Sequence, residues 1–210
     1  MKNPPRKGVF VIGVVLPTRG LVFTKVEQAI ESLRTKQPLV VFRSEALPIP
    51  DGHNLLTEQA LKAGCDYIWF IEEDTVPPPD ALNKLLELDS DIACIDYGVG
   101  GWGCVTRDKS GDILWCGLGC TLVKRHVLES LEMPWFRVDK TLRMNDWKWI
   151  DLPSEYIAKR NYGSLDIWFC TQAREKGFRI AQAEGECEHL QLITLGAREI
   201  NHGLHVIQPK

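Results

Sequence analysis

The chain has 210 residues, which is enough for one substantial hydrophobic core and short for two. Apolar residues make up 44% of it and charged residues 25%, as in an ordinary soluble globular domain. The formal net charge of −3 provides no basic field for a nucleic acid or an anionic membrane. The longest apolar run, residues 9–16, is far shorter than the ~20 residues of a membrane-spanning helix. We therefore expect a cytoplasmic protein without an integral membrane segment.

Seven cysteines are scattered along the chain, and several lie inside apolar runs such as DIACI and IWFCT. Reduced, buried thiols in a cytosolic protein are the simplest interpretation. The alternative is a zinc site made from Cys116, Cys120, Cys187 and His189, although the sequence lacks the CxxC pair that is typical of such sites.

The first half of the chain alternates predicted strands with predicted helices. The continuous apolar, β-branched run 8–17 predicts a strand that is covered on both faces. Apolar residues at i, i+3, i+4 and i+7, as in 26–33, predict amphipathic helices. The second helix has Asp51 or Asn54 as a candidate N-terminal cap and Gly64 as its end. Strands are predicted at 8–17, 38–42, 66–71 and 90–98, and helices at 26–33, 55–61 and 80–88.

Strands and helices that alternate at this spacing predict right-handed crossovers and parallel strands. We therefore expect an α/β fold with a Rossmann-like, mostly parallel sheet flanked by helices. Ligands of such sheets bind beyond the carboxyl ends of the strands. Loops 17–20, 43–45 and 72–74 should accordingly converge on one rim of the sheet.

The second half has a different character, with glycines and tryptophans crowded between residues 98 and 119. This pattern predicts short strands and turns, followed by a strand and a short helix in 121–131. Residues 134–163 lack clean periodicity and predict a long loop, which in a compact domain is usually functional or mobile. A helix at 164–177 and a strand at 178–190 follow.

Three consecutive acids, Glu72, Glu73 and Asp74, follow the apolar run YIWFI and precede three prolines. Residues i and i+2 of a strand point the same way, so Glu72 and Asp74 are predicted to share one target, with Glu73 turned aside. Two carboxylates suit Mg²⁺ or Mn²⁺, which leave positions open for phosphate oxygens. The alternative is that the acids cap the next helix and pair with lysines.

An apolar strand that ends in acid-x-acid and continues as PPxDAL resembles the GT-A glycosyltransferases, especially the family-2-like enzymes. Their short acidic motif, called DXD, binds a metal and the diphosphate of a nucleotide sugar. The resemblance implies a single GT-A-like domain over residues 1–210. Residues 1–98 would form its nucleotide-sugar-binding half, and residues 99–210 an acceptor and catalytic half with a smaller β and loop region. The other segments that resemble the family are VVLPTRG, DGHNLLTEQALKAGCDYIWFIEED, CGLGCTLVKRHVLESLEMPWF, GSLDIWFCTQAREKGFRI and ECEHL.

The resemblance also implies roles for single residues. Asp166 matches the catalytic base of an inverting transfer, and His189 matches a metal ligand beside Glu72 and Asp74. An imidazole among carboxylates favours Mn²⁺ over Mg²⁺. The chain departs from the family twice: Glu72 replaces the first aspartate, and Leu165 replaces the first acid of a Glu-Asp pair. Alternatively, Asp166 is an acid favoured by a helix dipole and His189 an ordinary histidine, and a retaining mechanism stays open.

The remaining candidates concern the nucleotide sugar. Thr18 and Arg19 are predicted to meet its base or phosphates, and Arg43 and Glu45 its base or ribose; the alternative is solvated loop charges. Trp147 and Trp149 would either stack on a sugar or pin the long loop. Gly117 to Gly119 would let the backbone approach a sugar, or else form a tight turn. The complete donor-binding set is Pro17, Thr18, Arg19, Arg43, Glu45, Asn54, Glu73, Gly117 and Gly119.

We therefore expect a glycosyltransferase that uses a nucleotide sugar, with UDP sugars favoured. Its acceptor would be a hydroxyl of a glycan, a protein, a lipid or another compound, and a homo-oligomer is compatible with this function. One alternative is a sugar-phosphate nucleotidyltransferase, for which PTRG lacks the usual glycine-rich loop. Another is a non-catalytic nucleotide-binding protein, which Leu165 favours.

Overall fold

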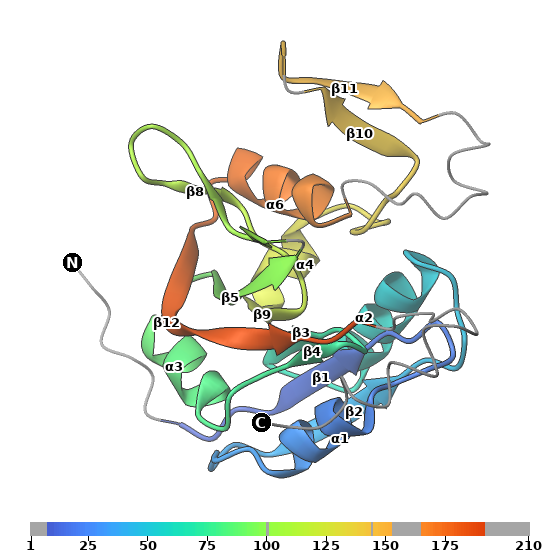
Figure 1. The fold of residues 1–210 in the computed structure, drawn as a ribbon, viewed down its shortest axis with the longest axis vertical. Coiled ribbons are helices and arrows are strands. Elements are labelled where there is room, and N and C mark those ends of the chain that lie inside the picture. The colour runs from blue at the N-terminus through green and yellow to red at the C-terminus, as the bar shows by residue number, and fades with distance from the viewer. Residues whose placement is uncertain (1–7, 100, 144, 153–164, 192–210) are drawn as a thin grey trace, which may run out of the picture.

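The computed structural model describes residues 8–99, 101–143, 145–152 and 165–191, which form an α/β fold (Figure 1). The strands of its large sheet lie in the order β2-β1-β3-β9-β5-β12-β4, and β6 pairs with β5. The described strands are β1 (Ile12–Leu16), β2 (Leu39–Arg43), β3 (Tyr67–Ile71), β4 (Thr75–Val76), β5 (Ile92–Val99), β6 (Trp102–Gly103), β7 (Thr106–Arg107), β8 (Ile113–Trp115), β9 (Cys120–Lys124), β10 (Lys140–Arg143), β11 (Lys148–Asp151) and β12 (Ile180–His189). The described helices are α1 (Thr24–Glu31), α2 (Asp51–Lys62), α3 (Ala81–Glu87), α4 (Arg125–Ser130) and α6 (Leu165–Glu175).

The sheet is mixed, with five long strands running in one direction. β1 is parallel to both β2 and β3, and β12 is parallel to β5. β9 lies between β3 and β5 and is antiparallel to both, so the fourth predicted strand is not a direct neighbour of the third. The described part of the connection from β5 to β9 contains no helix, and none is needed because an antiparallel strand does not require a crossover. Two strands from the second half of the sequence, β9 and β12, are thus inserted between strands from the first half.

The core consists of two apolar clusters, one on each face of the sheet. β1 divides its side chains between them, because Val15 faces one cluster while Val14 and Leu16 face the other. Helices α2, α4 and α6 cover the first face, and α1 and α3 cover the second. Burial on both faces explains the continuous apolar runs of β1 and β3, since each buried aliphatic side chain contributes about 1.5–3 kcal/mol. In the edge strand β2, by contrast, Val40 and Val41 are exposed.

Helix α2 packs closely on β1. A Cβ atom on Gly13 would lie 3.0 Å from both Ala60 Cβ and Cys65 Sγ, so this strand position needs glycine. The helix ends before Gly64, which has a φ of +82°. The predicted caps were wrong: Pro50 takes the N-cap position, and neither Asp51 nor Asn54 makes a side-chain capping bond. All seven cysteines are unpaired and six are buried, as the simplest interpretation predicted.

The predicted long loop at 134–163 contains a β-hairpin, so this expectation was wrong in part. β10 and β11 pair antiparallel and extend away from the main sheet (Figure 1). Trp149 packs edge-on against Trp168 of α6 with 5.0 Å between ring centroids, and Trp147 lies 6.1 Å from Trp115. These contacts attach the hairpin to α6 and β8. The strands are four residues long and mostly polar, which is too little for a periodicity signal.

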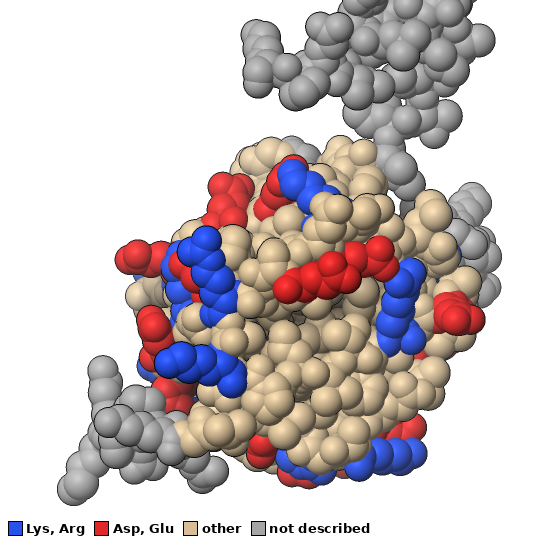
Figure 2. Space-filling model, turned by 90° about the horizontal axis from the view of Figure 1, so that it is seen from below, with Lys and Arg blue, Asp and Glu red and all other residues tan. Residues whose placement is uncertain are grey.

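The surface carries charges of both signs. On the face drawn in Figure 2, acidic side chains form a row near the middle, a broad uncharged area lies below this row, and side chains of both signs lie around the periphery. No helix within the described ranges has the length and apolar character needed to cross a bilayer.

Candidate functional site

Three pockets open around loop 17–20, which follows β1. The Ser44 pocket has a volume of about 480 Å³ and is lined by Thr18, Gly20, Arg43, Ser44, Glu45 and Ala46. The His189 pocket has about 500 Å³ and is lined by Arg19, Leu21, Phe23, Glu73, Asp74, His189, Leu190 and Gln191. The His53 pocket has about 390 Å³ and is lined by Pro17, Arg19, Ile49, His53, Glu72, Glu73, Asp74 and Val99. The predicted convergence of the three loops is confirmed.

The acidic segment is a turn and not the end of a strand. β3 ends at Ile71, and the amide of Thr75 donates to the carbonyl of Glu72 over 3.2 Å. The strand alternation that we predicted for Glu72, Glu73 and Asp74 therefore does not hold. A three-proline segment follows, but the turn itself is closed by its own backbone hydrogen bond.

Glu73 faces the site instead of turning aside. Its carboxylate accepts hydrogen bonds from the backbone amide of Arg19 over 2.7 Å and from Arg19 Nε over 2.5 Å. Arg19 also lies 3.9 Å from Asp74 Oδ2. Burial alone would lower the pKa of Arg19, but the hydrogen bond and charge of Glu73, with the charges of Asp74 and Glu72, raise it. Glu73 therefore fixes the first loop against the acidic turn.

Asp74 and His189 meet because β4 pairs with β12. Thr75 lies opposite His189 in this antiparallel pair, and the amide of Leu190 donates to the carbonyl of Asp74 over 2.8 Å. As a result, Asp74 Oδ2 lies 3.6 Å from His189 Nε2. Burial raises the pKa of Asp74, although the nearby His189 opposes this shift. The other ring nitrogen of His189, Nδ1, is buried without a hydrogen-bond partner in the described part of the chain.

Glu72 lies beside Tyr97. The hydroxyl of Tyr97 donates to Glu72 Oε2 over 3.4 Å and accepts a hydrogen bond from the amide of Gly119 over 3.1 Å. Burial, followed by the charges of Asp74 and Asp166, raises the pKa of Glu72 to about 8. At neutral pH this carboxyl group is thus mostly protonated unless a cation is nearby.

Asp166 is in the first turn of α6 and lies close enough to Glu72 for their charges to interact. Its carboxylate accepts a hydrogen bond from the amide of Ile167 over 2.9 Å. Burial raises the pKa of Asp166 to about 6. A carboxylate with a pKa close to neutrality can act as a general base. Leu165, the residue before it, is buried in the core.

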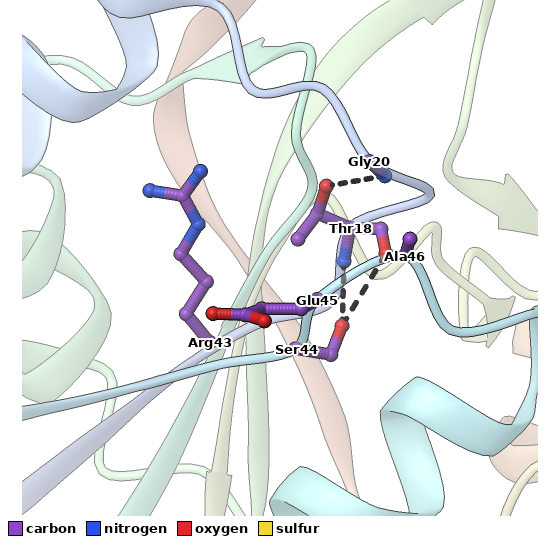
Figure 3. A pocket seen from close by; sticks show the side chains of 6 residues that line it. All are labelled: Thr18, Gly20, Arg43, Ser44, Glu45 and Ala46. Carbon is purple, nitrogen blue, oxygen red and sulfur yellow. Dashed lines mark hydrogen bonds between the residues drawn. The ribbon is translucent and has the colours of Figure 1, made fainter.

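The Ser44 pocket brings together three predicted donor residues, Thr18, Arg43 and Glu45. The hydroxyl of Ser44 accepts a bond from the amide of Thr18 over 2.9 Å and donates to its carbonyl over 3.4 Å, which joins the two loops (Figure 3). Figure 3 also shows Arg43 and Glu45 extending to the same side of the strand, away from Ser44. Arg43 forms an exposed ion pair with Glu27 at 2.5 Å.

The other predicted donor residues have structural partners. Asn54 donates to the carbonyl of Phe136 over 3.0 Å and accepts from its amide over 3.2 Å. A Cβ atom on Gly117 would lie 2.2 Å from the hydroxyl of Tyr97, and one on Gly119 would lie 2.6 Å from Thr75 Oγ1. These glycines therefore make room for the side chains of Tyr97 and Thr75, and Leu118 and Gly119 lie in a turn, as the second interpretation predicted. The approach of a sugar stays a prediction. Pro17 lines the His53 pocket.

The predicted metal site, which comprises Glu72, Asp74 and His189, stays a prediction. No group of three or more potential ligands that could hold a metal ion occurs among the described residues. This also leaves the zinc alternative without support. Asp74 and His189 supply one hard oxygen and one nitrogen at a pocket mouth, and the buried Nδ1 of His189 shows that this ring is not fully satisfied by the protein. Such a pair fits Mn²⁺ or Mg²⁺ held mainly by a diphosphate and water.

Two residues of the site gave no signal in the sequence. His53 lies on a helix face that otherwise follows the apolar pattern, and Tyr97 lies inside a buried strand. The i, i+3, i+4 pattern identifies a buried face but not the pocket beside it.

The fold and site define the chain as an α/β protein with an acidic, ligand-sized cleft at one rim of its sheet. No known family model matches the sequence, and no curated protein shows significant similarity to it. The structure is similar to the crystal structure of A197 from STIV, with a TM-score of 0.61 and 18% sequence identity. The similarity covers 88% of this chain and 87% of that chain, and at this identity it shows a shared fold alone.

Proposed function

We propose that this chain is a metal-dependent glycosyltransferase of the GT-A type. It would transfer a sugar from a nucleoside diphosphate sugar, with UDP favoured, to a hydroxyl of a glycan, protein, lipid or other acceptor. The observation that carries this proposal is the approach of Asp74 to His189, 3.6 Å apart between two pockets of the same rim.

The donor would bind along loop 17–20. Arg43 and Glu45 in the Ser44 pocket offer a guanidinium and a carboxylate to the hydrogen-bonding groups of a nucleoside. The diphosphate would then lie at Asp74 and His189. Arg19, although held by Glu73, adds a positive charge at this point. Mn²⁺ or Mg²⁺ bound there would neutralise charge on the leaving diphosphate.

Asp166 would act as the base of an inverting transfer. The acceptor oxygen forms a bond to the anomeric carbon, and the bond from that carbon to the diphosphate oxygen breaks with its electron pair. Asp166 takes the proton that the acceptor hydroxyl loses. With a pKa of about 6, its carboxylate is mostly ionised at pH 7 and basic enough to accept that proton.

A second candidate is a non-catalytic nucleotide-binding protein with the same fold. It is favoured by Leu165, a buried apolar residue at the position where the glycosyltransferases carry an acid beside the base. Both candidates predict nucleotide binding, and only the first predicts turnover.

Hydrolysis and transfer assays separate the candidates. Purified protein is incubated with MnCl₂ and a panel of UDP, GDP and dTDP sugars, and release of the nucleoside diphosphate is measured. Turnover that requires Mn²⁺ and falls in Asp166→Asn supports the glycosyltransferase. Binding without turnover, unaffected by Asp166→Asn, supports the non-catalytic protein. The absence of binding by the whole panel contradicts both.

A further inference from the structure

His53 is a buried histidine whose ring nitrogens have no hydrogen-bond partner among the residues that the structure describes. The residue is 1% exposed, and both Nδ1 and Nε2 are unpartnered within the described ranges. The ring lies against two aromatic side chains, with centroids 6.5 Å from Phe70 and 5.5 Å from Phe136. A buried polar group without a partner is unfavourable, and native proteins contain few of them. The histidine therefore needs an explanation other than packing.

His53 lines the His53 pocket together with all three acids of the turn, Glu72, Glu73 and Asp74. Burial, reinforced by the charge of Arg19, lowers the pKa of His53 to about 3, so the ring is neutral. A neutral imidazole offers one donor and one acceptor. A hydroxyl group, which can also donate and accept, matches it, whereas a phosphate offers acceptors alone at neutral pH. Carboxyl oxygens of Glu72 and Asp74 can accept hydrogen bonds from further hydroxyl groups.

We propose that His53 binds a hydroxyl group of a sugar that occupies the His53 pocket. This inference rests on the proposed function and deepens it, because it assigns the pocket to the sugar of the donor. The His53 pocket shares Arg19, Glu73 and Asp74 with the His189 pocket, so sugar and diphosphate would be adjacent. Since both ring nitrogens are covered by protein atoms, binding must shift the ring towards the pocket.

Three variants separate this role from packing. His53→Phe preserves an aromatic ring between Phe70 and Phe136 and removes both nitrogens. His53→Gln retains a donor and an acceptor. Thr57→Val is the matched control, because Thr57 lies on the same helix, is fully buried and has an unpartnered hydroxyl, but does not line the pocket.

Binding is measured by calorimetry with MnCl₂ present. The probes are the UDP, GDP or dTDP sugar that the wild-type protein binds most tightly and its parent nucleoside diphosphate. We expect His53→Phe to weaken binding of the nucleotide sugar at least tenfold and binding of the parent less than twofold. Its thermal midpoint should not fall. His53→Gln should lose less affinity than His53→Phe, and Thr57→Val should bind both probes as the wild type does.

An independent readout is the ¹⁵N chemical shifts of the His53 ring, assigned with the His53→Phe variant or by isotope-edited spectra if that variant does not fold. They should move when the nucleotide sugar is added and stay in place with the parent diphosphate. The inference is overturned, while nucleotide binding stands, if His53→Phe binds the nucleotide sugar as tightly as the wild type does. If His53→Phe does not fold, the inference is overturned when His53→Gln keeps the wild-type affinity and the ring shifts of the wild type do not move. If neither probe binds the wild type, the proposed function fails and the inference fails with it.

Discussion

Asp74 Oδ2 and His189 Nε2 lie 3.6 Å apart, although the two residues come from opposite halves of the chain. The contact is produced by two backbone pairs, Val76 with Glu188 and Thr75 with His189. Under the proposed function, this carboxylate and imidazole, held together by a short antiparallel ladder, would be a preorganised pair of metal ligands. Burial raises the pKa of Asp74, so a bound cation would favour its ionised form.

Removing either member of this pair should weaken metal binding. We expect Asp74→Ala and His189→Ala each to reduce Mn²⁺ affinity, measured by calorimetry with UDP present, by about 10-fold or more. Glu188→Ala is the control, because Glu188 is exposed and pairs with Lys25 at the surface. Equal affinities in all three variants would contradict the site. Glu72→Ala tests whether the first carboxylate of the acidic turn also contributes.

Glu72 should make stability depend on pH. Its folded pKa of about 8 is above the ordinary value of 4.5, so the folded chain keeps a proton that the unfolded chain releases between these values. The stability of the wild type should therefore decline, through this group, from pH 4.5 to 8 and level off above. Glu72→Gln has no group that ionises at this position, so it should not show this loss of stability. Without metal, its thermal midpoint should exceed that of the wild type by a few degrees at pH 8 and match it near pH 4.5.

A constant difference between Glu72→Gln and the wild type across this pH range would show that packing, and not ionisation, separates them. Glu184→Gln provides a matched control, because Glu184 is exposed and lies outside the part of β12 that pairs with β4.

Asp166 should control the rate of transfer without controlling donor binding. We expect Asp166→Asn to lower kcat by about 100-fold or more, with the affinity for the nucleoside diphosphate retained. In the wild type, kcat should fall as the pH drops through about 6, because protonation removes the base. Glu175→Gln, at the exposed end of the same helix, should keep the wild-type profile. A transfer rate that persists in Asp166→Asn assigns the base elsewhere.

The ion pair between Arg19 and Glu73 should stabilise the first loop. Glu73→Ala removes two hydrogen bonds from a mostly buried carboxylate, and we expect a loss of about 1 kcal/mol, reduced by the solvent exposure of Arg19. Urea unfolding measures this loss as a decrease in the free energy of unfolding. Lys25→Ala breaks an ion pair exposed on both sides, and its effect should stay within about 0.5 kcal/mol. Indistinguishable losses in the two variants would place Glu73 among ordinary surface charges.

Gly117 should be irreplaceable because of Tyr97. In Gly117→Ala the new methyl group would lie 2.2 Å from the tyrosine hydroxyl, and overpacking of this kind costs about 1–3 kcal/mol. Adding Tyr97→Phe removes the hydroxyl and should recover part of the loss in urea unfolding. Gly98→Ala is the control, since its nearest contact would be an ordinary 3.7 Å. If Gly117→Ala were as stable as the wild type, the chain segment before β9 would have to be free to move.

The location of the acidic segment 72–74 was predicted from the sequence, but the orientation of its side chains was not. The apolar run YIWFI correctly predicted β3, and the acids correctly lie at the rim of the sheet. Their orientation was predicted from strand alternation, which a backbone hydrogen bond between Thr75 and Glu72 interrupts. Whether a chain continues as a strand or turns after such a run depends on a pairing partner, here β12, which is distant in the sequence.

The sequence by itself determined the α/β class, the order of the main elements and the residues that gather at the rim, because periodicity, apolar runs and turn residues are local properties of the chain. The tertiary structure decided the insertion of β9, the pairing of Asp74 with His189 and of Glu73 with Arg19, and the isolation of His53. Those relationships arise because segments far apart in the chain pack together and exclude water. The resulting burial raises the pKa values of Glu72 and Asp166. It also leaves the ring nitrogens of His53 without partners among the described residues.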